Sequence, residues 1–410
     1  MRMKMTEIRV LTVLLYNKPI GTLTHLPGDR NLFAFDESYI KNPSRPILSL
    51  SFKESLGDLI TDVKTTRTRL PPFFSNLLPE GDLREYLAKR AGINPLHEFS
   101  LLMALGSDLP GALTIQEYEG RGDVFSSIDS EFKEEKKMGP AFHFSLAGVQ
   151  LKFSAIEKMD HGLLIPVDGV GGDWIIKLPH TKFRGVPENE YTMMELARRV
   201  GIDVPATRLI KMEDLQGLPE GFQTLGDSVF AIKRFDRKEN GDKVHIEDFA
   251  QVFGVYPEKK YNNANYRNIA NVVLREVGES GVVEFIKRFV FNSLIGNGDM
   301  HLKNWSLLYR QDNTVDLAPA YDFVSTILYL PGDRLALNFV DNKEFSSLNL
   351  SEFKRFAAKV ELSEKLVVET VQETVQLFSE IWKTAKDLPL EKELRSAIEK
   401  HLKTIPLWSL

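Results

Sequence analysis

The chain changes along its length from strand-rich to helix-rich segments, and this order constrains its fold more than any other feature. Strands are predicted for three segments in the middle of the chain: Phe142–Ala155, Trp174–Leu178 and Val229–Phe235. Most later segments have helical spacing: Ile246–Phe253, Ile269–Val277, Val282–Ile295, Ser351–Val360, Lys365–Trp382 and Glu391–Leu402. A strand-rich lobe followed by a helical lobe predicts an α+β, bilobal fold with a cleft between the lobes.

A further unit is expected before these two lobes, because 410 residues exceed what one core usually organises. Its expected strands are Ile8–Leu15, Lys18–Leu26, Leu48–Phe52 and Leu113–Tyr118, and its expected helices are Leu83–Ala91, Phe99–Leu105 and a region opening at Pro71-Pro72. Residues 119–140 are polar and charged, as in a connector. The predicted division is an N-terminal α+β domain (1–118), a connector (119–140), a strand-rich lobe (141–235) and an all-helical C-terminal lobe (236–410).

Composition excludes several classes of function. The net charge of −5 disfavours a protein that grips nucleic acid over its whole surface. The chain has no cysteine, so disulfides, cysteine-ligated zinc and thiol nucleophiles are excluded. The apolar run Val10–Tyr16 is too short to cross a bilayer, and the first ten residues lack a cleavable signal pattern. We therefore expect a cytoplasmic protein without membrane contact.

The stretch Gly296–Asn304 carries the strongest chemical signal. It follows an apolar helix and precedes an expected hairpin, Trp305–Tyr309 with Thr314–Leu317, that leads to Asp322. Phosphoryl transfer requires a carboxylate that orients the attacking hydroxyl and oxygen ligands that hold Mg²⁺ against the phosphates. Asp299 is the candidate base, Asn304 and Asp322 are the candidate Mg²⁺ ligands, and Lys303 is suited to offset charge on the transferred group.

Each part of this pattern has a simpler reading. An isolated Asp in a Gly/Asn turn is more often only a turn after a helix, and an Asp–Asn spacing of five is weak by itself. The joint pattern, with its flanking elements in order, favours a phosphotransferase. Lys177 adds to it, because a lysine inside an apolar strand requires a partner, and Glu190 at the start of the next helix is suited to that role. The alternative for Lys177 is a surface lysine at a strand edge.

Other segments are less specific. In Ser145–Lys152, Ala147 and Gly148 would allow close backbone approach to a phosphate, but a glycine-containing hairpin is equally ordinary. The glycine-rich run at 169–172 is interpreted as a hairpin turn, because it directly precedes the Lys177 strand. The histidines do not have metal-site spacing, and His301 is expected to support the Asp299 loop. His245 is expected at a helix start.

Together these residues resemble the HipA-type kinases. The matching motifs occur in the family's order along most of the chain: Phe74-x-Asn76-Leu77-Leu78-Pro79, Ser145–Lys152, Ile176-Lys177-Leu178-Pro179, Asn189-Glu190-Tyr191, Arg234-Phe235-Asp236-Arg237, Glu247-Asp248 with Gln251, Asp299-x-His301-x-Lys303-Asn304 and Tyr321-Asp322. Leu151 departs from the charged residue frequent in the family, and position 233 is lysine, but neither removes a catalytic group.

The resemblance implies a protein-kinase-like fold and an ATP- and Mg²⁺-dependent serine/threonine kinase. Asp299 would then be the base, with Lys303 and His301 in the same loop, and Asn304 and Asp322 would hold the metal. The implied nucleotide-binding residues are Lys177, Glu190, Ala147, Gly148, Val149, Gln150, Lys152, Lys233, Phe235 and Tyr321. Ser145 corresponds to an autophosphorylated serine, whose modification is expected to switch the kinase off by expelling the phosphate loop.

The resemblance also implies a toxin of a toxin–antitoxin pair. Its partner would be a HipB-like helix-turn-helix antitoxin, through which it would contact DNA indirectly. Its substrate would be a cytoplasmic protein, in the best-known case an aminoacyl-tRNA synthetase, glutamyl-tRNA synthetase. Two alternatives from other classes remain: a small-molecule phosphotransferase of the aminoglycoside type, and a catalytically silent co-repressor or docking module.

Overall fold

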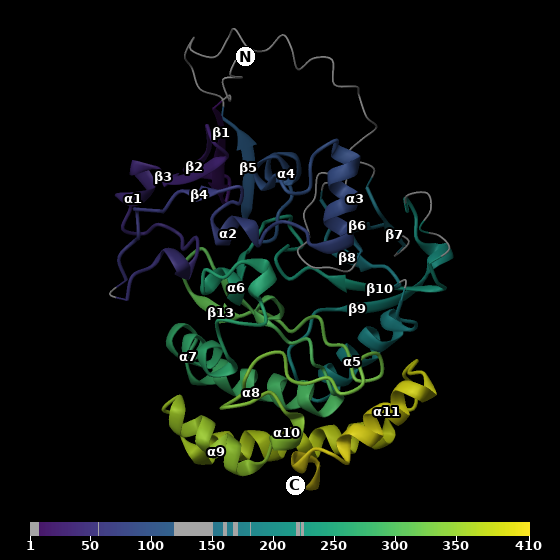
Figure 1. The fold of residues 1–410 in the computed structure, drawn as a ribbon. Helices are drawn as coiled ribbons and strands as arrows, with labels where there is room; N and C mark the ends of the chain where they lie inside the picture. Colours follow the sequence, from purple (N-terminus) through teal and green to yellow (C-terminus); the bar gives the residue numbers. More distant parts are fainter. Residues whose placement is uncertain are drawn as a thin grey trace.

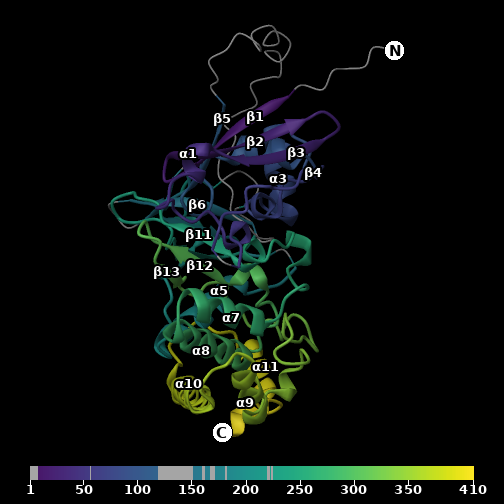
Figure 2. The ribbon, with the colours of Figure 1, turned by 90° about the vertical axis from the view of Figure 1, so that its left-hand side faces the viewer.

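The computed structural model describes residues 8–55, 57–118, 151–158, 162–166, 171–180, 182–218, 222 and 225–410. The connector expected at 119–140 lies outside these residues. In two views at right angles, an N-terminal sheet occupies one end of the molecule and the last helices the opposite end (Figures 1 and 2). Among the described helices, none is long and apolar enough to cross a membrane.

The N-terminal region is built on a sheet of five described strands in the order β4-β3-β2-β1-β5. The strands are β1 (Arg9–Leu15), β2 (Lys18–Leu26), β3 (Arg30–Phe35), β4 (Thr66–Arg67) and β5 (Leu113–Glu117). The hairpin β1–β2 turns at Tyr16 and Asn17, both with positive φ, as two-residue hairpins require. The helices of this region are α1 (Glu37–Ile40), α2 (Pro72–Ser75), α3 (Gly81–Ala91) and α4 (Glu98–Leu105).

One sequence expectation in this region was wrong, and one strand was not anticipated. The strand expected at Leu48–Phe52 is a 3₁₀ helix at Leu50–Phe52, which begins where the Ser49 side chain accepts a hydrogen bond from the Ser51 amide. A serine cap of this kind competes with strand pairing. Strand β3 was not anticipated, although it pairs along its length with β2.

A second sheet has the order β7-β6-β8-β10-β9. Its strands are β6 (Lys152–Glu157), β7 (Leu163–Leu164), β8 (Trp174–Lys177), β9 (Thr207–Lys211) and β10 (Ser228–Lys233). Helix α5 (Val186–Arg199) contacts β9 and β10 and buries Met193, Met194 and Ala197 against the core. The sheet and α5 therefore form the strand-rich lobe that the sequence indicated.

A third, small sheet interrupts the helical part of the chain, in the order β11-β12-β13. Its strands are β11 (His245–Asp248), β12 (Ser306–Tyr309) and β13 (Val315–Leu317). The hairpin β12–β13 was expected, but the helix expected from Ile246 was wrong. Burial alternates along β11, and the helix begins only after Asp248, whose side chain forms a capping box with Gln251. The second lobe is thus helical except for these strands.

The helices of this lobe surround a common apolar core. They are α6 (Phe249–Val252), α7 (Tyr266–Glu276), α8 (Glu279–Ile295), α9 (Leu350–Lys359), α10 (Glu364–Thr384) and α11 (Lys392–Leu402). Helix α8 is buried along most of its length and contacts α7, α10 and α11. It ends at Gly296, which has φ of 67° and would bring any Cβ to 2.7 Å from Ile327. Helix α8 therefore ends immediately before the loop that carries Asp299.

A buried ionic network joins the N-terminal region to the chain that follows β10. Arg234 donates to both carboxylate oxygens of Asp236, at 2.9 and 2.8 Å, and Arg237 donates to Asp236 and to Asp108. The Gly111 amide also donates to Asp236 at 2.8 Å. Burial alone would raise the pKa of Asp236, but the two guanidinium groups hold it well below its usual value. Removing this carboxylate would leave Asp108 as the one carboxylate paired with these two buried guanidinium groups.

We expect Asp236→Ala to lower the free energy of unfolding by about 3–5 kcal/mol, because Arg234 and Arg237 lose one of the two carboxylates that compensate their burial. Urea unfolding followed by circular dichroism measures the change. Glu37→Gln, in the exposed pair with Lys41, is the control and should barely move the midpoint. Equal, small effects of both substitutions would contradict the role assigned to the network.

Candidate active site

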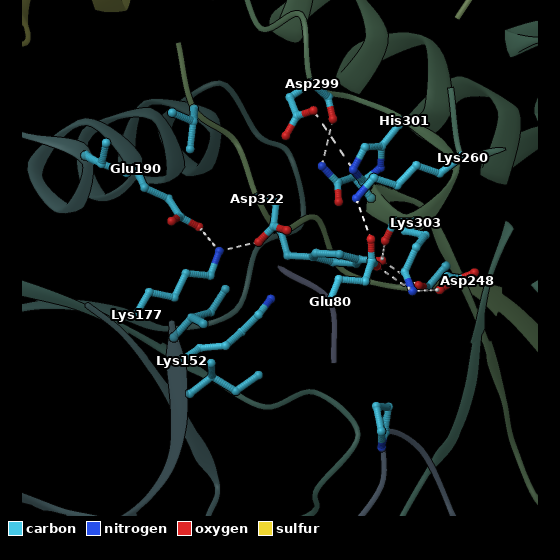
Figure 3. Close-up of a pocket in the computed structure, with 18 of the residues that line it drawn as sticks. Glu80, Lys152, Lys177, Glu190, Asp248, Lys260, Asp299, His301, Lys303 and Asp322 are labelled. Atoms are coloured by element: carbon cyan, nitrogen blue, oxygen red, sulfur yellow. Dashed lines mark hydrogen bonds and ion pairs between the residues drawn. The ribbon is translucent and has the colours of Figure 1, made fainter. Parts of the chain in front are cut away.

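A cleft of about 590 Å³ collects the side chains that the sequence singled out. Its walls come from all three sheet regions, and Figure 3 shows its charged residues. The lining residues that bear on chemistry are Asn76, Glu80, Lys152, Lys177, Glu190, Lys233, Phe235, Asp248, Lys260, Tyr261, Asp299, His301, Lys303, Asn304, Tyr321 and Asp322. Residues separated by more than 200 positions in the chain thus face one cavity.

Lys177 lies at the centre of one wall, at the end of β8. Its ammonium group is ion-paired with Glu190 of α5 and with Asp322 of the second lobe (Figure 3). The side chains of Lys177 and Glu190 are 5% and 1% exposed. Burial alone would lower the pKa of Lys177, but Asp322 and Glu190 raise it above its usual value. The predicted ion pair between Lys177 and Glu190 is confirmed, and Lys177 also forms an ion pair with Asp322.

Lys152 lies directly opposite Lys177 across the antiparallel pair β6–β8. Directly opposed residues project to the same face of a sheet, and like charges in such a pair repel each other. Lys152 is only 9% exposed, and its ammonium group has no ion pair or hydrogen bond with a described residue. Burial lowers its pKa to about 8, and Asp322 opposes this only in part. The buried ammonium group of Lys152, beside that of Lys177, favours an anionic ligand, because an unpaired buried charge is costly.

The loop after α8 is held by side-chain amides. Asn297 donates to Asn292 Oδ1 at 2.8 Å and accepts the Asp299 amide at 3.0 Å. Asn304 donates from Nδ2 to the Asp299 carbonyl oxygen at 2.8 Å. The carboxylate of Asp299 stays half-exposed, at 52% of its side-chain surface, and faces the cleft. This arrangement leaves the candidate base accessible on a fixed backbone.

Tyr261 is a neighbour of the base that the sequence did not indicate. Its hydroxyl donates to Asp299 Oδ1, and its ring meets that of His301 edge-on at 4.9 Å between centroids. Loss of water inside the cleft is the main cause that raises the pKa of Asp299, whereas the Tyr261 hydrogen bond opposes the rise. Water still reaches half of this side chain, which moderates the rise. No local motif marks Tyr261, because it reaches the loop from a segment 38 positions away in the chain.

His301 and Lys303 point away from open solvent. Burial lowers the pKa of His301 to about 3, so the imidazole is neutral and suited to supporting the loop. The Lys303 ammonium donates to the Asn76 carbonyl oxygen at 3.0 Å and to Asn76 Oδ1 at 3.2 Å, and it pairs with Glu80 at 3.0 Å. The three protons of Lys303 are therefore directed at the N-terminal region. This lysine was expected to offset charge on the transferred group, and here its donors are already engaged.

The far end of the cleft is formed where β10 leaves the second sheet. The Lys233 amide donates to the Ala206 carbonyl oxygen at 2.9 Å. The backbone group of Lys233 that remains to hydrogen-bond an adenine ring is therefore its carbonyl oxygen. Phe235 lies against Tyr321, with ring centroids 5.7 Å apart. The Tyr321 hydroxyl is held by Ser306 and by the Lys303 carbonyl oxygen. A flat apolar surface beside backbone polar groups is suited to an adenine ring.

The residues proposed for Mg²⁺ supply suitable donors. Asn304 uses its amide nitrogen within the loop, which leaves its oxygen as the ligand. Asp322 keeps an ionised carboxylate, because burial would raise its pKa but Lys177 and Lys152 hold it well below the usual value. Its backbone has φ of 57°, a strained conformation that functional sites retain. No cluster of three acidic or histidine side chains occurs in the described ranges, and Mg²⁺ commonly completes its shell with phosphates and water.

Several predicted residues lie outside the described part of the chain. These are Ser145, Ala147, Gly148, Val149 and Gln150, and half of the glycine-rich run at 169–172. Their roles remain predictions.

Comparisons with known proteins identify the family. Residues 144–382 match the HipA-like C-terminal domain, and residues 11–116 match the HipA N-terminal domain. A Sinorhizobium fredii protein named as a candidate kinase, Y4dM, is 50% identical over 98% of this chain and 99% of its own length. The serine/threonine-protein kinase toxin HipA of Shewanella oneidensis is 23% identical over 74% of each chain.

The fold is also similar to a solved structure. The complex of Shewanella oneidensis HipA, HipB and operator DNA contains a chain that superposes with a TM-score of 0.70 at 19% identity. The match covers 97% of this chain and 96% of that chain, so both the N-terminal sheet and the two lobes are shared. On the matching domains and the full-length relative, this chain belongs to the HipA-like kinase family.

Proposed function

We propose that the protein is an ATP- and Mg²⁺-dependent serine/threonine protein kinase. The observation that carries the proposal is the pair of buried lysines, Lys152 and Lys177, on one face of the second sheet beside Asp322. Such a face favours a polyphosphate, and the accessible carboxylate of Asp299 lines the same cleft. A triphosphate and a base in one cavity are the two requirements of phosphoryl transfer to a hydroxyl group.

The residues divide the reaction among them. The serine oxygen attacks the γ-phosphorus of ATP and forms a new P–O bond while the bond to the β,γ-bridging oxygen breaks and ADP leaves. Asp299 orients the hydroxyl and accepts its proton. Lys177 and Lys152 balance negative charge on the phosphates, and Lys233, Phe235 and Tyr321 receive the adenine. Mg²⁺, held by Asn304 and Asp322, would neutralise charge between the phosphates and on the departing oxygen.

A protein substrate is favoured over a small molecule. The N-terminal region lines the cleft with Asn76 and Glu80, which a simple bilobal small-molecule kinase would not need. A relative from Shewanella oneidensis is named a serine/threonine-protein kinase toxin. An aminoglycoside-type phosphotransferase and a silent co-repressor are the alternatives, and labelling of an aminoglycoside or failure to bind Mg·ATP would favour them respectively.

The proposal extends to partners and regulation. The structure of the Shewanella oneidensis relative contains HipB and operator DNA, so we propose a HipB-like antitoxin as partner, with DNA contacted through it. We further propose a cytoplasmic substrate of the aminoacyl-tRNA synthetase class and autophosphorylation at Ser145. We also propose that the boundaries between the N-terminal domain, the connector, the strand-rich lobe and the helical lobe lie at residues 118, 140 and 235.

Lys152→Met should weaken Mg·ATP binding about tenfold, because it removes one of two positive charges facing the phosphates. The free energy of unfolding should stay the same or rise, since an unpaired buried ammonium group is replaced by an apolar side chain. Calorimetric titration and urea unfolding measure the two quantities. Lys211→Met, at an exposed site on β9 of the same sheet, is the control; unchanged ATP affinity in Lys152→Met would contradict the phosphate site.

Asp299→Asn should leave the fold and Mg·ATP binding intact and slow transfer by about 100- to 10,000-fold, because it removes the base and keeps the shape. The measurement is the phosphate transferred from γ-labelled ATP to protein in a bacterial extract, with and without a Mg²⁺ chelator. Asp316→Asn, outside the cleft on β13, is the matched control. Transfer by Asp299→Asn near the wild-type rate would refute the assignment.

Ser145→Ala should abolish phosphate incorporation into the chain itself during incubation with Mg·ATP, because the acceptor hydroxyl is lost. Mass spectrometry of the intact protein and of its peptides measures the stoichiometry and the position. Ser126→Ala, at a serine in the predicted connector, is the control and should retain incorporation. Unchanged incorporation in Ser145→Ala would show that another residue is modified.

A further inference from the structure

A short segment of the N-terminal region, residues 76–80, reaches into the cleft beside the candidate base. It connects the end of α2 to the start of α3. Asn76 is 1% exposed, and its amide nitrogen donates to the carbonyl oxygens of Pro72 at 2.9 Å and Val255 at 2.8 Å. These two hydrogen bonds fix the orientation of the side-chain amide. Its oxygen accepts a hydrogen bond from Lys303 at 3.2 Å.

Glu80 lies at the end of this segment, where its side chain has an unusual orientation for its position. It is the N-cap residue of α3, but its side chain makes no capping hydrogen bond. Serine, threonine, aspartate and asparagine are the usual residues at such a position. The carboxylate instead turns into the cleft, where 13% of the side chain is exposed. Local helix formation therefore does not account for a glutamate here.

The carboxylate of Glu80 bridges two lysines of the second lobe (Figure 3). Lys260 donates to its Oε2 at 3.0 Å, and Lys303 pairs with its Oε1 at 3.0 Å. The side chains of Lys260 and Lys303 are 9% and 4% exposed. Burial alone would raise the pKa of Glu80, but the two lysines lower it to about 2, so the bridge is ionic at neutral pH.

Both lysines belong to segments that hold Asp299. Lys303 lies in the same loop, four positions after the base. The Lys260 carbonyl oxygen accepts the Leu302 amide at 3.2 Å, and the next residue, Tyr261, donates its hydroxyl to Asp299. One carboxylate from the N-terminal region thus joins the two pieces of backbone between which the base is held. Loss of that bridge would free both pieces to shift.

We propose that Glu80 is a positioning residue for phosphoryl transfer, which holds the Asp299 loop through Lys260 and Lys303 and makes the N-terminal region part of the active site. The inference rests on the proposed kinase function. Displacing a base by about 1 Å costs up to about 100-fold in rate. Glu80 pairs with Lys260 and Lys303, and its charge acts on Lys152 less than those of Asp322 and Glu190 do, so nucleotide binding should be preserved.

The test is Glu80→Gln, which keeps the shape of the side chain and removes its charge. The maximal rate of phosphate transfer from Mg·ATP to protein should fall about 10- to 100-fold, and the KM for Mg·ATP should change by less than about twofold. A loss of domain docking alone would instead lower stability without lowering the maximal rate of the folded protein. Rates are therefore measured on folded protein, below the unfolding midpoint found by circular dichroism.

Glu258→Gln is the matched control. Glu258 lies two positions before Lys260 and also joins the N-terminal region, through Arg69, but this pair is exposed and outside the cleft. It should keep the wild-type rate. If Glu80→Gln does not fold, the double variant Glu80→Gln with Lys260→Met avoids an unpaired buried cation at position 260, and it should show the same loss of rate.

The outcomes separate the two claims. A maximal rate in folded Glu80→Gln, or in the folded double variant, equal to that of the wild type would overturn the role of Glu80 and leave the kinase proposal standing. The same holds if Glu258→Gln loses as much rate as Glu80→Gln. Absence of any transfer by the wild-type protein with Mg·ATP would overturn the proposed function, and this inference with it.

Discussion

The site depends on the ammonium group of Lys177, which is ion-paired with two carboxylates from different parts of the chain. Glu190 belongs to α5 and Asp322 follows β13, so the ion pairs connect the second sheet to the helical lobe. Without Lys177, both carboxylates would be buried or half-buried near each other, which is costly. The opposed Lys152 adds a second positive charge that balances the four groups, but its ammonium group has no ion pair of its own with a described residue, which favours an anion beside it. The charged groups that connect the two lobes are therefore the same groups that favour an anionic ligand.

The N-terminal region is bound to the kinase lobes by buried polar contacts in addition to an apolar core, in which Leu83 of α3 packs with Phe153 and Ile176 of the second sheet. Asp108 joins the ionic network of Arg234, Asp236 and Arg237. On the other side of the same boundary, Asn76 and Glu80 contact Lys303. Charges of this kind are stabilising only when each partner is in place. The N-terminal region and the Asp299 loop therefore share buried hydrogen bonds and ion pairs.

Much of the fold could be predicted from local pattern. The hairpin β1–β2, helices α5 and α8 to α11, and the hairpin β12–β13 follow from hydrophobic periodicity and from turn residues. The errors occurred where a side chain competes with the backbone pattern: Ser49 starts a 3₁₀ helix, and Asp248 delays helix α6 by capping it. The Lys177–Glu190 pair could be predicted because both residues lie in neighbouring elements, and a buried lysine requires a partner.

The sequence by itself determined which groups could perform the chemistry, because Asp299, Asn304 and Asp322 occur in an ordered motif with recognisable flanking elements. Only the tertiary structure decided what surrounds them. The contact of Lys303 with Asn76 spans 227 positions, and the opposition of Lys152 and Lys177 depends on strand register. Local periodicity carries no information about such pairings, since they arise when distant surfaces pack and every buried charge has to find a partner.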